Sequence, residues 1–318
     1  MKKIVLTTLS LLFMLTACNV KEDLDDCPGG ETRIQVYVEK FQSEEDGSMP
    51  ANSEAQFNTR INDLTFYLYK GDDLVEQGEL DVTGVTAQTY SFAYPSLSYG
   101  DYTLVLLGNT SNNRPALRSI PDTDLVYPGY AKTEDYFRDS FDFTVEDKEV
   151  HTYTTQLKRV QGLVRFNFLN LPDYVTAIDV TLDELSSHSH RDGSYTDEYT
   201  FSRHLAESVL VRDAENAHSF TVMTYPTLDG EKSSWRVKVY RDGSDVPYYD
   251  RIVMTDLHVL RNQLLDLTVE FPDDPDDPDP TPDPDPDPED INFYVGLNNE
   301  WDGQNLVEVP VEGPEVWQ

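Results

Sequence analysis

The feature that most constrains the fold is a two-residue periodicity of apolar side chains. Ile34, Val36 and Val38 alternate with polar or tyrosine positions, and Leu64, Phe66 and Leu68 do the same. Successive side chains of a strand point to opposite faces of a sheet, so this pattern predicts half-buried strands of antiparallel sheets. Further short strands, separated by Gly and Asp turns, are expected at 102–107, 140–145, 152–157, 163–169, 177–182, 219–223, 235–240, 251–254 and 264–271.

Helical periodicity is scarce. Only residues 203–211 show it. A polar loop is expected at 186–197. The strand pattern fades between 109 and 139, and this loss of pattern predicts a long connection with one helical turn. So many short strands pack most naturally as β-sandwiches. The chain is long enough for two domains, and we predict an N-terminal sandwich at 31–158 and a C-terminal sandwich at 159–271.

The first 18 residues have the organisation of a lipoprotein signal peptide. Lys2 and Lys3 precede an apolar segment of 14 residues, which ends in Leu15-Thr16-Ala17-Cys18. A basic start, a short apolar run and small residues at the cleavage position are typical of secretory signals, and cleavage before a cysteine is typical of bacterial lipoproteins. The alternatives are a plain signal with a chance cysteine and a transmembrane helix, which needs about 20 apolar residues. We predict a signal peptide at 1–17 and lipid on Cys18.

Acyl chains on Cys18, such as palmitate, would tether the chain to a membrane without spanning it. One acyl chain binds marginally, whereas two or more hold stably. The protein part has a formal net charge of −35, which excludes binding to nucleic acid or to an anionic bilayer through its own charge. Cys27 is the only other cysteine, so neither an intrachain disulfide nor a cysteine metal cluster is expected once Cys18 carries lipid.

The segment from 18 to 30 is polar and forms a tether. Lys21, Glu22 and Asp23 stand just behind the predicted lipid site. The simple interpretation is a solvated linker. A lysine followed by acids also resembles the surface-export signal of Bacteroidetes lipoproteins, which implies a protein that faces the cell surface.

The region after 271 changes character twice. Residues 272–290 are a Pro/Asp segment, which stays extended because proline removes backbone donors and like charges repel each other; it can span roughly 55 Å. Residues 291–318 then regain strand character, with Ile291, Phe293, Val295 and Leu297 in alternation. An isolated hairpin is at best marginally stable in water. The tail therefore needs a sheet to join.

Residues that carry chemistry are few. Phosphate loops, nucleophile elbows and zinc-protease motifs are absent from the sequence. His188 and His190 make half of a metal site at most, and a solvated hairpin loop explains them better. Trp235 is the one tryptophan of the two predicted domains, which counts against a carbohydrate platform. We predict no cofactor, no metal, no catalytic residues and no small-molecule substrate.

Several motifs occur in a fixed order along the chain. They are Cys18…Glu22-Asp23-Leu24…Asp26-Cys27-Pro28-Gly29-Gly30, Tyr99-Gly100-Asp101-Tyr102-Thr103 with Gly108-Asn109, Leu157-Lys158-Arg159 before 162–169, and Arg261-Asn262 before 264–271. This set resembles the FimB-type fimbrial anchor lipoproteins of Bacteroidales over roughly residues 18–271. The resemblance implies two transthyretin-like β-sandwiches at the base of a pilus, held in the outer membrane by lipid. It implies other fimbrial subunits as partners, and it gives Cys27 no chemical role.

The tail resembles a different element, the C-terminal extension with which fimbrial subunits complete a neighbour's sheet. We therefore predict that Ile291, Phe293, Val295 and Leu297 form a donor strand, because an added strand gains main-chain hydrogen bonds and side-chain pockets. The alternative is that the tail docks on its own second domain, which the long Pro/Asp segment also permits.

Other functions compete with the anchor. A polymerising stalk or tip subunit would be cut after a basic residue, and Arg33 and Arg60 are the candidate cut sites. A surface glycan-binding lipoprotein shares the signal and the β-rich body. An enzyme is the weakest alternative, since no motif supports it.

Overall fold

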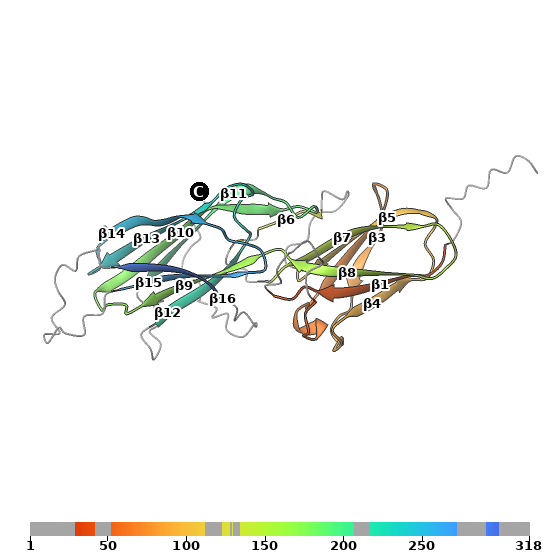
Figure 1. Cartoon of the computed structure of the whole chain (residues 1–318), viewed down its shortest axis with the longest axis horizontal. Coiled ribbons are helices and arrows are strands. Elements are labelled where there is room, and N and C mark those ends of the chain that lie inside the picture. Colours follow the sequence, from red (N-terminus) through yellow and green to blue (C-terminus); the bar gives the residue numbers. More distant parts are fainter. Residues whose placement is uncertain are drawn as a thin grey trace, which may run out of the picture.

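The computed structural model describes residues 29–41, 52–111, 123–127, 129, 134–206, 217–271 and 291–298. It confirms the all-β prediction: two β-sandwiches lie end to end along the longest axis of the molecule (Figure 1). The helical content of the described residues is one short 3-10 helix, η2 (Phe57–Thr59).

The first sandwich is a seven-stranded sheet that folds over on itself in the order β3-β2-β5-β7-β8-β1-β4. The fold-over lies between β7 and β8, which pair only through Phe137↔Arg159 and Arg138↔Lys158. Ile34, Leu68 and Leu104, all fully buried, fill the space between the two layers. The strands are β1 (Thr32–Val38), β2 (Leu64–Lys70), β3 (Asp73–Leu80), β4 (Tyr90–Tyr94), β5 (Gly100–Gly108), β7 (Phe137–Val145) and β8 (His151–Arg159).

The second sandwich has two separate sheets, β11-β10-β13-β14 and β12-β9-β15-β16. Its core contains stacked Phe166 and Phe220 and the fully buried Trp235. Strand β6 (Leu125–Val126) precedes β7 in the chain yet pairs with β10, so the long connection reaches across to the second sandwich. The other strands are β9 (Gly162–Leu169), β10 (Val175–Ser189), β11 (Tyr195–Ala206), β12 (Ala217–Thr224), β13 (Ser233–Arg241), β14 (Tyr249–Leu257), β15 (Leu264–Glu270) and β16 (Asn292–Asn298).

The two sandwiches repeat one topology. In each, the first strand pairs in parallel with the last strand of the seven, β1 with β8 and β9 with β15. The orders β3-β2-β5-β7 and β11-β10-β13-β14 correspond strand by strand, as do β8-β1-β4 and β15-β9-β12. Among the described residues of the first sandwich, β16 has no counterpart. It is therefore an addition to a repeat that is already complete.

The strands β2 and β5 differ from the half-buried strands that the alternation predicted. Tyr67 and Tyr69, on the face of β2 expected to meet solvent, are 3% and 0% exposed. They form a third buried cluster with residues from β5, from the long connection before β7, from the segment that links the sandwiches and from the second sandwich. These residues are Val105, Leu107, Leu125, Tyr127, Tyr136, Val160, Tyr195 and Tyr225. Both faces are buried because this cluster packs on the outside of the first sandwich.

Three local expectations were wrong. The polar loop expected at 186–197 is only a short turn, because β10 continues to Ser189 and β11 begins at Tyr195. The helical pattern at 203–211 lies in strand β11 as far as Ala206, and residues 207–211 are outside the described part. Strands β3 and β4 were not predicted. The apolar side chains of β3 do not alternate, whereas the aromatic residues Tyr90, Phe92 and Tyr94 of β4 do. The helical turn expected within 109–139 lies partly outside the described residues.

Candidate functional site

The C-terminal strand β16 lies at the edge of the second sandwich. It runs antiparallel to β15 in an unbroken register, from Leu264↔Asn298 to Glu270↔Asn292. The predicted donor segment thus docks here on its own domain, the alternative that the sequence left open, and a pairing between chains stays a prediction.

Side chains of the tail enter the core through one face. Ile291 is 8% exposed and belongs to the core cluster of the second sandwich. Phe293 packs edge-on against Trp235 and is stacked on Tyr249, with ring centroids 5.8 Å apart in both pairs. Such aromatic pairs contribute about 0.5–1.5 kcal/mol beyond the burial of their area. Phe293 is therefore the main anchor of β16.

Positions 292 and 294–296 of the tail are exposed. Val295, expected to point inward, is 38% exposed, and Tyr294 is 51% exposed. The Tyr294 hydroxyl donates a hydrogen bond to Glu270 over 2.9 Å, and this bond to a carboxylate raises the pKa of the tyrosine. In the described part of the chain, β16 pairs with β15 alone, so its other edge carries no partner strand. The tail is held by few buried side chains.

The connection between β15 and β16 is far longer than their pairing requires. Glu270 and Asn292 are directly paired, yet the 19 residues from 272 to 290 separate Phe271 from Ile291. Adjacent antiparallel strands are commonly joined by two to five residues. The loop-closure cost grows as 1.5RT times the logarithm of loop length, so this connection costs about 2 kcal/mol more than a two-residue turn. Docking on the same domain does not explain the length.

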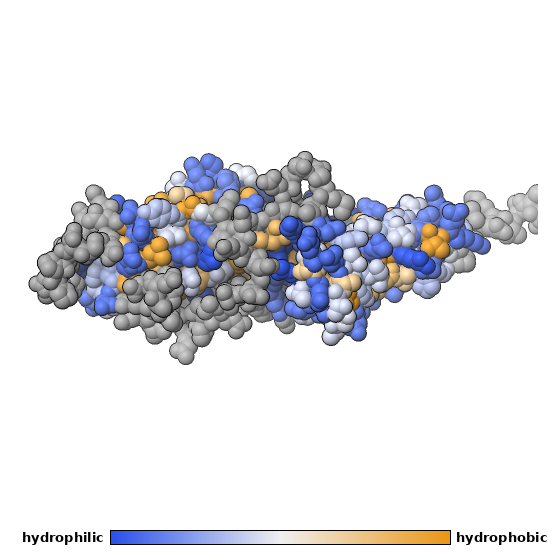
Figure 2. All heavy atoms as spheres, turned by 60° about the horizontal axis from the view of Figure 1, so that its bottom comes forward, coloured by the Kyte–Doolittle hydropathy of each residue, from blue (hydrophilic) through white to orange (hydrophobic). Residues whose placement is uncertain are grey.

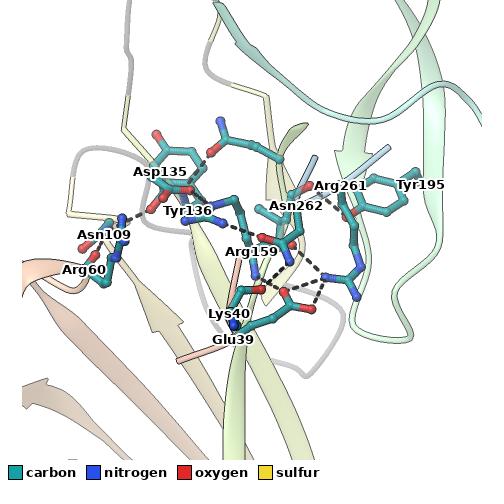
Figure 3. Close-up of polar contacts among 12 residues, drawn as sticks. Glu39, Lys40, Arg60, Asn109, Asp135, Tyr136, Arg159, Tyr195, Arg261 and Asn262 are labelled. Atoms are coloured by element: carbon teal, nitrogen blue, oxygen red, sulfur yellow. Dashed lines mark hydrogen bonds and ion pairs between the residues drawn. The ribbon is translucent and has the colours of Figure 1, made fainter. Parts of the chain in front are cut away.

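A second conspicuous site is the junction between the sandwiches, where three of the sequence motifs meet (Figure 3). Arg159, at the end of β8, donates through Nε to Asp135 over 2.7 Å and through Nη1 to Asn262. Asn262, just before β15, donates to the backbone carbonyl of Lys40 over 2.9 Å. These bonds join the two sandwiches to each other and to Asp135 in the long connection before β7.

Glu39 is the buried carboxylate of the junction. Its side chain is 1% exposed and accepts hydrogen bonds from Arg261 over 2.9 Å and from the backbone N–H of Arg159 over 3.1 Å. A carboxylate out of water is tolerated only when it is paired and hydrogen-bonded in this way. The residues lie more than a hundred positions apart, so no local pattern indicates their meeting.

Asn109 fixes the start of the connection. Its φ of 60° is a left-handed conformation that asparagine tolerates better than most residues. Its side chain accepts from the N–H of Asn62 over 2.7 Å and donates to the carbonyls of Arg60 and Asp135 over 2.8 Å each. Three bonds from one buried amide explain why asparagine stands after Gly108.

The histidine pair takes part in the junction through hydrogen bonds. His190 lies in the β10–β11 turn, with Nδ1 2.6 Å from Asp124 and Nε2 2.6 Å from Thr196. His188 is 3.1 Å from Asp197. Among the described residues, no group of three or more His, Cys, Asp or Glu side chains is arranged to hold a metal ion.

The other predicted site residues divide into two groups. Cys18, Lys21, Glu22 and Asp23 lie outside the described residues, as does the side chain of Leu297. Trp235 is described and is 0% exposed, so it has no free face for a sugar. On the face shown in Figure 2, hydrophilic side chains dominate the described surface and hydrophobic ones form small separate spots. No described helix is long and apolar enough to cross a membrane.

Solved structures share this architecture. A proposed adhesin from Bacteroides ovatus has a TM-score of 0.55 and 10% identity, covering 89% of this chain and 98% of that one. The fimbrial anchor protein Mfa2 from Porphyromonas gingivalis has a TM-score of 0.51 and 11% identity, covering 86% and 98%. A proposed polysaccharide-binding protein from Bacteroides thetaiotaomicron has a TM-score of 0.53 and 14% identity, covering 76% and 91%. At these identities the likeness shows the fold alone, and no curated protein gives a significant match.

The fold and the junction define the class: a two-domain β-sandwich protein built like fimbrial and adhesin subunits. The family follows from the sequence itself. Residues 24–305 match the model of the fimbrillin-A associated anchor proteins Mfa1 and Mfa2, which is most of the chain, so the protein belongs to this family. The expected fimbrial anchor family is thus confirmed, and the chain is a fimbrial subunit.

Proposed function

We propose that the chain is the lipid-anchored subunit that tethers a pilus to the outer membrane and joins its neighbour by adding a strand. It is of the FimB type, its lipid is on Cys18, and Lys21-Glu22-Asp23 directs it to the cell surface. Its role is structural and its partners are other fimbrial subunits. Family membership supports the anchor, and the sequence Leu15-Thr16-Ala17-Cys18 supports the lipid.

The observation that carries strand addition is the connection before β16. Glu270 and Asn292 are already paired although 21 residues lie between them, and the reach of the 19-residue Pro/Asp segment, roughly 55 Å, permits β16 to pair with another subunit. The segment also brings its own anchor residues, Ile291 and Phe293, to any sheet edge that offers an apolar groove. The docked arrangement then represents the subunit before assembly.

A reversible disulfide between β15 and β16 tests strand addition. Thr268 and Tyr294 are directly opposite in the register. Cysteines at both positions, in a Cys27→Ser background, would hold β16 on its own domain. We expect this variant to assemble no fimbriae under oxidising conditions and to recover with reductant. Each single-cysteine variant is the matched control. Normal assembly with the disulfide fully formed would contradict strand addition by β16.

The rival function is a stalk or tip subunit, which loses its anchor by cleavage. Arg33 lies within β1, which pairs with β4 and β8 on its two sides, so cleavage there requires local unfolding. Arg60 lies after η2 and outside the strands, and a cut there would remove β1 from its place between β8 and the edge strand β4. A mature N-terminus at Ile61 would therefore favour the stalk.

A glycan-binding function has one observation in its favour, the similar fold of the proposed polysaccharide-binding protein. The buried Trp235 gives it no support. Specific binding on a glycan array would revive it.

A further inference from the structure

A large hollow of the described surface lies at the domain junction. It has a volume of about 740 Å³, within the range of about 300–1,000 Å³ that is usual for ligand sites. The walls come from β7, from β8, from the β10–β11 turn and from the residues just before β15. Because both sandwiches contribute, the shape of the cleft depends on the junction described above.

The charge of this cleft is opposite to that of the protein. Five lysine and arginine side chains line it, against three aspartates, in a chain whose net charge is −35. Three of the five pair with carboxylates outside the lining, Arg159 with Asp135, Arg261 with the buried Glu39 and Arg191 with Asp142. The cations that a ligand can reach are Lys158 and Arg191, while Arg138 is buried.

Arg138 is a buried guanidinium with too few acceptors. Its side chain is 4% exposed, and it donates to the carbonyl of Ser189 over 2.9 Å and to Thr123 over 3.1 Å. Its Nε has no acceptor among the described residues. The nearest carboxylate, Asp124, lies 3.4 Å away and also accepts from His190. Asp124 therefore serves both Arg138 and His190, and the three lining aspartates, Asp124, Asp139 and Asp192, are fewer than the five lining cations.

The other two cations are accessible. Lys158 is exposed and makes no ion pair within the part of the chain that the structure describes. Arg191 donates to Asp142 over 2.7 Å, but Asp142 is 70% exposed. Surface ion pairs of this kind contribute only about 0–1 kcal/mol. An incoming carboxylate can replace Asp142 at little cost, because the guanidinium fork fits any carboxylate.

The lining favours an acidic peptide over an acidic sugar. Its one aromatic residue, Tyr195, is 7% exposed and its hydroxyl is bonded to the carbonyl of Val160. It offers no flat face for a sugar ring. An extended Asp/Pro segment suits an open basic cleft, because proline limits the conformational freedom lost on binding and each aspartate presents a carboxylate. The chain itself carries such a segment at 272–290.

We propose that the junction cleft binds an extended Asp-rich peptide segment supplied by a neighbouring subunit, with Lys158 and Arg191 as its cationic contacts and the buried charge of Arg138 as a further source of positive potential. That the donor is a fimbrial subunit rests on the proposed function; that the cleft binds such a peptide does not. An occupied cleft would brace the two sandwiches of a load-bearing subunit against each other.

The test measures fluorescence anisotropy with a labelled peptide of residues 272–290 and the chain without residues 1–18. The chain's own Pro/Asp segment competes with the labelled peptide equally in every variant, so the affinities of the variants can be compared with one another. Lys158→Glu reverses the charge at an accessible position of the cleft. The matched control is Lys148→Glu, which makes the same charge change on an exposed residue away from the cleft. Peptide with Asn and Gln in place of Asp and Glu controls for charge.

We expect saturable binding that weakens with salt and that Lys158→Glu reduces about five- to tenfold, while Lys148→Glu changes it less than twofold. The neutral peptide should not bind. Equal losses in the two variants, or no binding at all, would overturn the proposal. Polygalacturonate that binds at the cleft where the peptide does not would also overturn it, in favour of an acidic glycan. None of these results depends on fimbrial assembly, so the proposed function is tested separately.

Discussion

Replacing Phe293 by alanine tests whether β16 is a separable, weakly held element. The ring contacts Trp235 and Tyr249 at 5.8 Å and is half-buried. Truncating a fully buried phenylalanine costs about 3–5 kcal/mol. Half of that burial gives about 2 kcal/mol. Since 1.36 kcal/mol corresponds to a tenfold change, the opening equilibrium of β16 should rise about 30-fold.

Hydrogen exchange measured by mass spectrometry reads this out directly. The amides of β15 and β16 should exchange faster in Phe293→Ala, while those of β10 and β13 stay protected because the rest of the core is intact. Val295→Ala on the same strand is the matched control, since Val295 is 38% exposed and should change exchange little. Unchanged exchange in Phe293→Ala would refute the account of Phe293 as the anchor. Equal acceleration throughout the second sandwich would show that β16 is part of its cooperative unit.

Two further predictions concern the junction and the cleft. Glu39→Gln removes the buried negative charge that pairs with Arg261. We expect this variant to lower the free energy of unfolding, measured by urea denaturation, by about 3 kcal/mol. A decrease below about 0.5 kcal/mol would contradict the importance of the pair. Asp139 has its pKa raised to about 6, chiefly by burial. The folded state therefore binds the proton more tightly than the unfolded state, so this group's contribution to stability falls as pH rises from about 4 to about 6 and stays low above that range. Asp139→Asn should remove that fall, which is on the order of 3 kcal/mol, and identical pH profiles of the two proteins would contradict the raised pKa.

The strands were predictable where the signal is local. Ile34, Val36 and Val38 alternate because one face of β1 meets the core, and that needs no knowledge of the rest of the chain. The burial of Tyr67 and Tyr69 was not predictable in this way. Their cover comes from Tyr195 and Tyr225, more than a hundred residues away, so the alternation of β2 indicated a solvent face that does not exist.

The candidate site shows the same limit. Alternation at Ile291 and Phe293 indicated a strand, but not the sheet that it joins, because pairing depends on edges made elsewhere. The motifs at Asn109, Arg159 and Arg261-Asn262 were visible as separate stretches. The fold alone brings Arg159 and Arg261 to Glu39, and Asn109 and Arg159 to Asp135. The junction between the domains thus explains why these residue types occur in the motifs, and the separate motifs do not reveal it.

The central claim is that this chain is a retained, lipid-anchored subunit. Its most direct test is the intact mass and N-terminal analysis of the mature protein taken from the outer membrane. We predict a chain that begins at acylated Cys18 and extends through the tail at 291–318. An unacylated chain that begins at Ile34 or Ile61 would contradict the anchor and identify a processed stalk or tip subunit.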